Sequence, residues 1–321
     1  MPFFEKENLK MYYEDVGKGE PIITIHGLLE DGSYWTQSGI TAALVEKDYR
    51  LINIDMRGHS RTVVKEPYGF DADTMAKDFD DLADYLGIEK FHLLSHATGG
   101  MVAARYAMTR SERLISLMQT DTGSSTQPEM VPSPTRKEET PPPDGKLTEQ
   151  QINILTAADP HITKIPASVF ELTPDQINIL KEAAINVPLE DKIAAHKGNP
   201  DVFVFKMAEH PDSERLWNIY YSFWHRHDWR QALNFQWSFY TDPNPRIEQL
   251  RQIKCPTLVL LGEFDLVFLK ESEIMAKEIP DARHVIMKGL GHMTALEAPD
   301  RLVAELLDFL DCVKQTGKAI K

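Results

Sequence analysis

Short apolar runs alternate with longer amphipathic segments along the first 122 residues. Residues 21–25, 50–54 and 91–94 are mostly apolar, as expected of strands that other elements cover on both faces of a sheet. Residues 71–86 instead carry apolar side chains at helical spacing, with aspartates and lysines between them. Strands that alternate with helices at this pitch predict a parallel sheet with helices on both faces.

Two local patterns add detail to this alternation. Residues 9–14 and 21–25 are β-rich runs separated by Gly-Lys-Gly at 17–19, a sequence typical of a hairpin. Residues 33–47 are interpreted as a single helix.

The composition changes after the first 122 residues. Residues 124–146 consist mainly of Ser, Thr, Pro and charged residues, which predicts a loop or a mobile linker. Residues 147–155 return in similar form at 172–180. In both copies a glutamine follows a threonine three residues later, the spacing of a capping box, so each copy predicts the start of a helix.

Aromatic residues are concentrated in the last part of this insertion. Four of the five tryptophans lie within residues 201–240. Together with the two helix starts, they predict a helical cap with a proline-rich linker at 123–245, placed over the carboxyl end of the sheet. The flanking segments 1–122 and 246–321 are expected to form the two parts of the sheet domain.

The composition limits the kinds of partner. The chain has 321 residues, of which 42% are hydrophobic and 26% charged, and a formal net charge of −14. This negative charge repels phosphate backbones and anionic lipids, so we expect neither nucleic acid nor a membrane as a partner. The two cysteines form no metal-binding motif, and residues 1–7 lack the pattern of a signal peptide, so we expect a cytoplasmic protein.

The strand at 91–94 runs into a turn at 95–99 with the sequence Ser-His-Ala-Thr-Gly. A helix rich in glycine and alanine follows. A strand, a tight turn and a helix with small residues make up a nucleophile elbow, whose usual pattern is Gly-x-Ser-x-Gly. Here the position of the attacking residue is occupied by Ala97, whose methyl group cannot act as a nucleophile.

Two further strands lead to residue types that suit acid–base chemistry. Residues 256–261 lead to Asp265, and residues 284–287 lead to His292. Because the carboxyl ends of parallel strands meet at one edge of a sheet, we expect these side chains to lie near Ala97. The order elbow, acid, histidine is that of α/β-hydrolases. The chain therefore resembles a capped member of the α/β-hydrolase superfamily, which implies a mostly parallel, eight-stranded-type sheet flanked by helices.

The resemblance implies a role for each matched position. His292 corresponds to the general base, and Asp265 to the carboxylate that orients its imidazole. The backbone N–H groups of Leu28 and Thr98 correspond to the two donors of an oxyanion hole. No cofactor and no metal are implied. The reaction expected of the parent enzyme is hydrolysis of a carboxylic ester or lactone through an acyl-enzyme at residue 97.

Ala97 leaves three interpretations open. In the first, the chain is an engineered Ser→Ala form of a hydrolase. In the second, it is a natural nucleophile-free lyase or cofactor-independent dioxygenase that uses His292 and Asp265 as its base. In the third, it is a non-catalytic ligand-binding protein with the same fold. The intact acid and base favour chemistry over binding alone.

Other side chains have both a functional and a structural interpretation. His26 is a candidate for substrate binding, but histidines at such turns are more often structural partners. Trp217, Tyr221 and Trp224 are candidates for binding a hydrophobic small-molecule substrate, and they suit the core of the cap equally well. Asp121, which also follows a strand, is an alternative acid for the triad.

Overall fold

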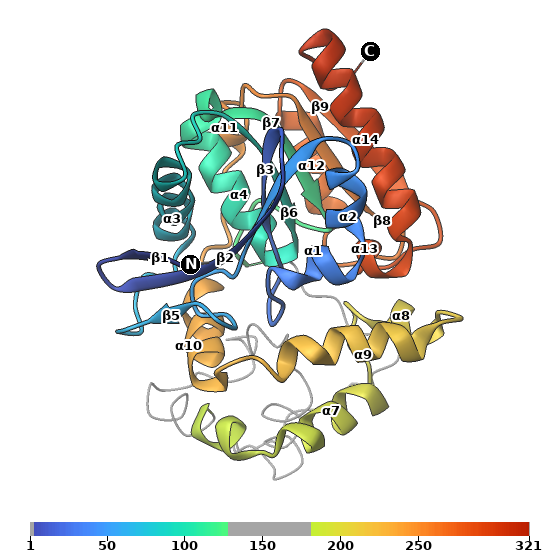
Figure 1. The fold of residues 1–321 in the computed structure, drawn as a ribbon. Coiled ribbons are helices and arrows are strands. Elements are labelled where there is room, and N and C mark those ends of the chain that lie inside the picture. Colours follow the sequence, from blue (N-terminus) through green and yellow to red (C-terminus); the bar gives the residue numbers. More distant parts are fainter. Residues whose placement is uncertain (1–2, 128–180, 321) are drawn as a thin grey trace.

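The computed structural model describes residues 3–127 and 181–320, and its centre is a nine-stranded sheet (Figure 1). The strands are β1 (Phe3–Lys6), β2 (Leu9–Gly17), β3 (Glu20–Ile25), β4 (Tyr49–Ile54), β5 (Val63–Val64), β6 (Phe91–His96), β7 (Leu114–Thr120), β8 (Thr257–Gly262) and β9 (Ala282–Met287). Their order is β1-β2-β4-β3-β6-β7-β8-β9, and β5 pairs with β2.

The predicted fold class is confirmed, with a mixed rather than purely parallel sheet. Neighbouring strands from β4 to β9 are parallel, whereas β1, β2 and β5 pair antiparallel at one edge. The sheet exceeds the expected eight strands by one, since the two-residue β5 joins its edge.

The hairpin prediction for residues 17–19 is wrong. β4 lies between β2 and β3, antiparallel to the first and parallel to the second. β3 lies between two parallel strands, β4 and β6. This position agrees with its apolar sequence, because strands inside a parallel sheet are covered on both faces. The glycines still make a tight reversal, because Gly17 and Gly19 have positive φ. A Cβ on Gly17 would lie only 2.5 Å from the carbonyl oxygen of Tyr49.

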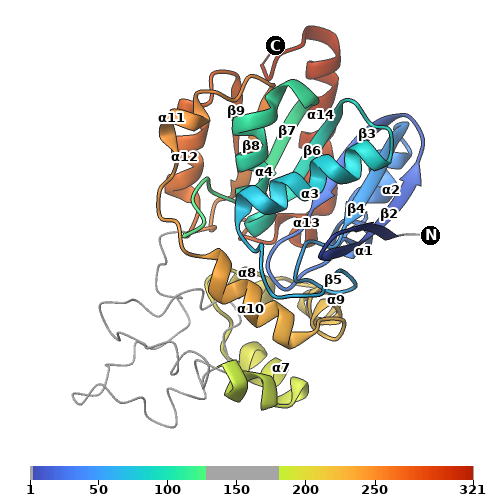
Figure 2. The ribbon, with the colours of Figure 1, turned by 90° about the vertical axis from the view of Figure 1, so that its left-hand side faces the viewer.

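Helices cover both faces of the sheet (Figures 1 and 2). One face carries α3 (Ala72–Tyr85), α4 (Ala97–Arg110), α11 (Ile247–Leu250) and α12 (Leu269–Glu278); on the other, α2 (Ile40–Val45) packs against α14 (Pro299–Thr316). The short elements α1 (Ser33–Gln37), a 3-10 turn at Ser111–Arg113 and α13 (Thr294–Glu297) complete this part. The single helix predicted at 33–47 is instead two helices, because Gly39 between them has a φ of +87°.

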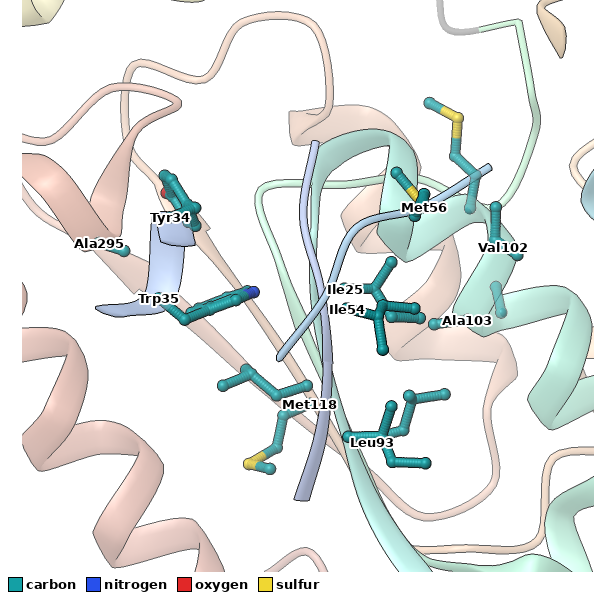
Figure 3. Packing of buried hydrophobic residues seen from close by; sticks show 14 of the residues in the cluster. Ile25, Tyr34, Trp35, Ile54, Met56, Leu93, Val102, Ala103, Met118 and Ala295 are labelled. Atoms are coloured by element: carbon teal, nitrogen blue, oxygen red, sulfur yellow. The ribbon is translucent and has the colours of Figure 1, made fainter. Parts of the chain in front are cut away.

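The glycine-rich start of α4 packs closely on the sheet. A Cβ on Gly99 would lie 2.4 Å from the carbonyl oxygen of His26, and one on Gly100 would lie 2.4 Å from the side chain of Thr122. Further along the helix, Val102 and Ala103 are fully buried. Figure 3 shows them on one side of the strands, with Tyr34 and Trp35 of α1 on the other.

The inserted segment contributes helices beyond one end of the sheet (Figure 1). Those with described bounds are α7 (Leu189–Gly198), α8 (Phe205–Glu209), α9 (Ser213–Trp224) and α10 (Trp229–Phe239). The repeat at 147–155 and 172–180, and most of the predicted linker, lie outside the described residues. No helix in the two described ranges has the length and apolar character needed to cross a membrane.

The two ends of the insertion lie side by side. The backbone N–H of Thr126 donates to the carbonyl oxygen of Asp242 at 3.0 Å, and the Ser124 hydroxyl donates to the carbonyl oxygen of Pro245 at 2.7 Å. The chain thus leaves the sheet domain after β7 and returns to it at the same place. This arrangement allows a cap to be inserted without breaking the order of the strands.

The close approach of α4 generates a stability prediction. Gly99→Ala should lower the free energy of unfolding by about 1–3 kcal/mol although alanine favours helices, because its Cβ would overlap the His26 carbonyl. Gly198→Ala is the matched control. A Cβ there meets nothing within 4 Å, so this variant should be neutral or more stable by up to about 1 kcal/mol. Urea unfolding compares the two, and equal stability would contradict the overlap.

Candidate active site

The turn between β6 and α4 holds Ala97 in a left-handed backbone conformation. Its φ is +47°, a region that costs a residue with a side chain about 1–2 kcal/mol. The Thr122 hydroxyl fixes this turn by donating to the carbonyl oxygen of Ala97 at 2.6 Å. Glycine would adopt the same backbone without that cost. A strained turn that nevertheless carries a side chain is a functional-site candidate.

His292 and Asp265 form a buried pair. Nδ1 of His292 lies 2.9 Å from Oδ2 of Asp265, and the two residues are 5% and 1% exposed. The alternative acid, Asp121, is directed elsewhere. Its Oδ2 lies 3.5 Å from Nδ1 of His96 and accepts the Thr294 hydroxyl at 2.5 Å. The structure therefore brings together Asp265 and His292, the acid and the base that the sequence analysis identified by their order along the chain.

The loop after β3 carries Leu28, one of the two expected oxyanion donors. Its N–H makes no hydrogen bond within the described parts of the chain. The N–H of Thr98, the other donor, belongs to the first turn of α4, where backbone N–H groups lack intrahelical partners. Both donors thus belong to segments that can offer a free N–H to a ligand.

His26, a candidate for substrate binding, uses both ring nitrogens for the backbone. Nε2 accepts the N–H of Met56 at 2.9 Å, so Nδ1 carries the proton and donates to the carbonyl oxygen of Gly27 at 2.7 Å. Burial lowers the pKa of His26, which favours this neutral form. The arrangement fits the structural interpretation, because His26 ties its own loop to the loop after β4.

Glu30 is a site residue that the sequence analysis missed. Its Oε2 accepts the N–H of Gly27 at 2.7 Å, and its Oε1 lies 3.4 Å from Nε2 of His96. A Cβ placed on Gly27 would lie 3.0 Å from Oε2 of Glu30 and 3.1 Å from the Cβ of Ala97. A carboxylate that is 2% exposed thus lies beside residue 97. Its position directly after the His-Gly-Leu-Leu loop was the available signal.

The two carboxylates keep His96 charged. Burial opposes the charge on the imidazole, but Glu30 and Asp121 outweigh it and raise the pKa of His96 to about 10. Burial raises the pKa of Asp121 despite the neighbouring His96. Burial also raises the pKa of Glu297 to about 7, although that carboxyl accepts the N–H groups of Gly291 and Met293. At neutral pH the site therefore carries a proton on His96 and a partly protonated carboxyl at Glu297.

The three cap aromatics proposed for substrate binding lie in a ring cluster. Trp217 stacks on Tyr221 with ring centroids 5.3 Å apart, and Tyr221 meets Trp224 edge-on at 5.0 Å. All three also contact the ring of His196. Within the described ranges, no ring contact joins any of them to His292. Their role in substrate binding stays a prediction.

Other aromatics lie against the candidate base. The ring of Phe203, at the start of the same aromatic run, is 4.9 Å from the ring of His292 in an edge-on arrangement. Phe268 stacks on His292 at 5.5 Å. The hydroxyls of Tyr240 and Thr98 are hydrogen-bonded to each other. The inserted segment thus contacts the candidate site through residues that helical spacing alone did not single out.

Among the residues that the structure describes, no group of three or more His, Cys, Asp or Glu side chains is arranged so that it could hold a metal ion. The histidines and carboxylates of the site instead pair with one another and with backbone N–H groups. The geometry is that of an acid–base site next to a strained turn.

The family comparison agrees with this fold. The alpha/beta hydrolase fold family matches residues 20–299. This chain therefore belongs to the α/β-hydrolase fold family.

Individual relatives are distant or match in part. The 2-hydroxy-6-oxononadienedioate/2-hydroxy-6-oxononatrienedioate hydrolase 1 of Dechloromonas aromatica is 24% identical over 94% of this chain and 91% of its own length. Non-heme chloroperoxidase CPO-A1 of Kitasatospora aureofaciens is 35% identical over 32% of this chain, which spans only 36% of that relative. A thermophilic esterase from Thermogutta terrifontis has the same fold, with a TM-score of 0.67 and 21% identity over 95% of this chain and 94% of the esterase.

The charge on His96 generates a pH prediction. A histidine whose pKa rises on folding stabilises the protein fully below its unfolded pKa of about 6.5, and this stabilisation is lost as the pH rises towards 10. An NMR titration should therefore find the His96 imidazole still protonated at pH 8. Glu30→Gln should lower its midpoint, whereas Glu46→Gln, which changes an exposed carboxylate, should not. A midpoint near 6.5 in the unmodified protein would contradict the ion pair.

Proposed function

We propose that this chain is a hydrolase of a carboxylic ester or lactone of a hydrophobic small molecule, with its nucleophile replaced by alanine. One observation carries the proposal: Ala97 occupies a strained left-handed turn directly after His96, whose ring lies 4.9 Å from that of His292, the partner of Asp265. A binding protein would have no need of the strain, since glycine would relieve it.

In the proposed mechanism a serine at residue 97 attacks the carbonyl carbon of the ester. His292 takes the hydroxyl proton and then gives it to the leaving alkoxide, while Asp265 orients the imidazole and stabilises its charge. The N–H groups of Leu28 and Thr98 stabilise the negative charge on the carbonyl oxygen. Water activated by His292 then cleaves the acyl-enzyme. A lactone is a cyclic ester and reacts in the same way.

Several findings support the substrate class. The Dechloromonas relative, which aligns with almost the whole chain, carries the name of a hydrolase. The rings of Phe203 and Phe268 against His292 suit a substrate with an apolar group beside the reacting carbonyl. We propose a cap at 123–245 between core segments 1–122 and 246–321, and Trp217, Tyr221 and Trp224 as a more distant part of the substrate-binding region.

A second candidate is a nucleophile-free lyase or cofactor-independent dioxygenase. Glu30 favours it, because a buried carboxylate beside Ala97 accepts the N–H of Gly27. In this candidate the His292–Asp265 pair takes a proton from an acidic substrate without any nucleophile, and Glu30 keeps the neighbouring His96 charged. In this case alanine is the natural residue at position 97.

Restoring the nucleophile separates the two candidates. Ala97→Ser should hydrolyse p-nitrophenyl acetate or butyrate faster than the unmodified protein by a factor on the order of 10⁴, as expected when a complete triad is compared with one that lacks its nucleophile. The matched control Ala97→Ser/His292→Ala should lose the gain. Equal rates for the Ala97→Ser variant and the unmodified protein would contradict the proposed hydrolase and leave the nucleophile-free candidate.

A further inference from the structure

One segment of the cap lies directly on the loops that carry the candidate base and acid. The ring of Phe203 contacts His292 at 4.9 Å. Lys206, three residues later, packs so close to Gly291 that a Cβ on that glycine would lie 2.7 Å from the Cβ of Lys206. The Lys206 ammonium also lies 4.6 Å from the ring centre of Phe264, next to Asp265. The cap therefore touches both loops over the short stretch 201–206.

A chain of buried hydrogen bonds holds this stretch in place. Oδ1 of Asp201 accepts the backbone N–H of Phe203 at 2.8 Å. Its other oxygen, Oδ2, lies 3.2 Å from Nε2 of His196. Nδ1 of His196 lies 2.9 Å from the hydroxyl of Tyr221. One tautomer of His196 fits both contacts. Its Nε2–H donates to Asp201, and its Nδ1 accepts the hydroxyl proton of Tyr221.

This hydrogen-bond network is buried and closely surrounded by aromatic rings. His196 and Asp201 are 0% and 2% exposed. The rings of Trp217, Tyr220 and Trp224 surround the imidazole at centroid distances of 5.1–6.1 Å. Breaking one bond of such a buried network leaves a polar group unpaired and destabilises the fold around it. The aromatic cluster of α9 thus supports the network and, through it, the backbone position of Phe203.

We propose that Phe203 is a specificity-determining residue beside His292 and that Asp201, His196 and Tyr221 are its positioning residues. The proposal rests on the proposed hydrolase function and narrows it. The rings of Phe203 and Phe268 both lie on the imidazole, with their own centroids 6.2 Å apart, and this apolar corner favours a flat apolar group on the acyl side of the substrate. The preferred substrates are therefore esters of arylalkanoic acids rather than of short aliphatic acids.

The position of the Phe203 ring against His292 can be tested without measuring catalysis. The ring current of Phe203 should shift the NMR signals of the His292 imidazole C–H groups in the protein with Ala97. Phe203→Leu should move these signals, and Asp201→Ala should move them in the same direction by releasing the Phe203 backbone. Asp212→Ala removes a half-exposed aspartate at the start of α9 and should leave them unchanged. Unchanged signals in Phe203→Leu would overturn the placement.

Specificity is tested by binding and by kinetics. Phenylacetamide, an aryl acyl analogue, should bind the Ala97 protein more weakly by a factor on the order of ten after Phe203→Ala, whereas acetamide binding should change little. In the Ala97→Ser background the same substitution should raise KM for p-nitrophenyl phenylacetate more than for p-nitrophenyl acetate, with kcat changed less than KM. Phe203→Tyr keeps the ring and should restore the preference.

The outcomes separate this inference from the function on which it rests. If Ala97→Ser hydrolyses neither ester, the proposed function fails, and the phenylacetamide titration still decides the role of Phe203. If Ala97→Ser is active but Phe203→Ala affects both esters and both amides equally, the hydrolase stands and the specificity role is wrong. An Asp201→Ala protein that binds phenylacetamide as the unmodified protein does would remove the positioning role of the hydrogen-bond chain.

Discussion

The close contact between the first turn of α4 and the end of β3 is the constraint on which the site depends. Gly99 lets the helix approach the carbonyl oxygen of His26, where any side chain would overlap it. That approach forces the chain to turn sharply at Ala97, with a φ of +47°. It also brings the elbow against the loop of Gly27 and Leu28. The close packing at Gly99 therefore lies at the junction of the strained turn and the loop that carries Leu28.

Three buried histidines, His26, His96 and His227, differ in their charge states. His26 and His227 each bond to backbone carbonyl oxygens, and burial lowers their pKa values, so both are neutral. His96 is equally buried but lies between Glu30 and Asp121, which raise its pKa. An ion in a low-dielectric interior persists only with a close counter-charge. The neighbours, rather than the depth of burial, therefore determine where positive charge lies near residue 97.

The cap and the site share more than one contact. Nε of Arg226, at the end of α9, donates to Asp31 at 2.7 Å, in the loop that begins with the proposed oxyanion donor. Tyr240 bonds to Thr98 at the elbow, and Phe203 contacts His292. Residues of the inserted segment thus contact three of the loops that carry the candidate site residues. Side chains far apart in the sequence thus make up the surroundings of these three loops.

The sequence alone determined the features that depend on local periodicity and on chain order. Apolar runs and helical spacing predicted the layers, and the small residues after residue 97 predicted the elbow. Asp265 and His292 could be matched because parallel strands bring their carboxyl ends to one edge. Only the tertiary structure decided that β4 lies between β2 and β3 and that Glu30 lies near residue 97. It also decided that the ring of Phe203, rather than that of Trp217, contacts His292. Strand neighbours and side-chain partners depend on packing between segments far apart in the chain, and neither periodicity nor spacing encodes that packing.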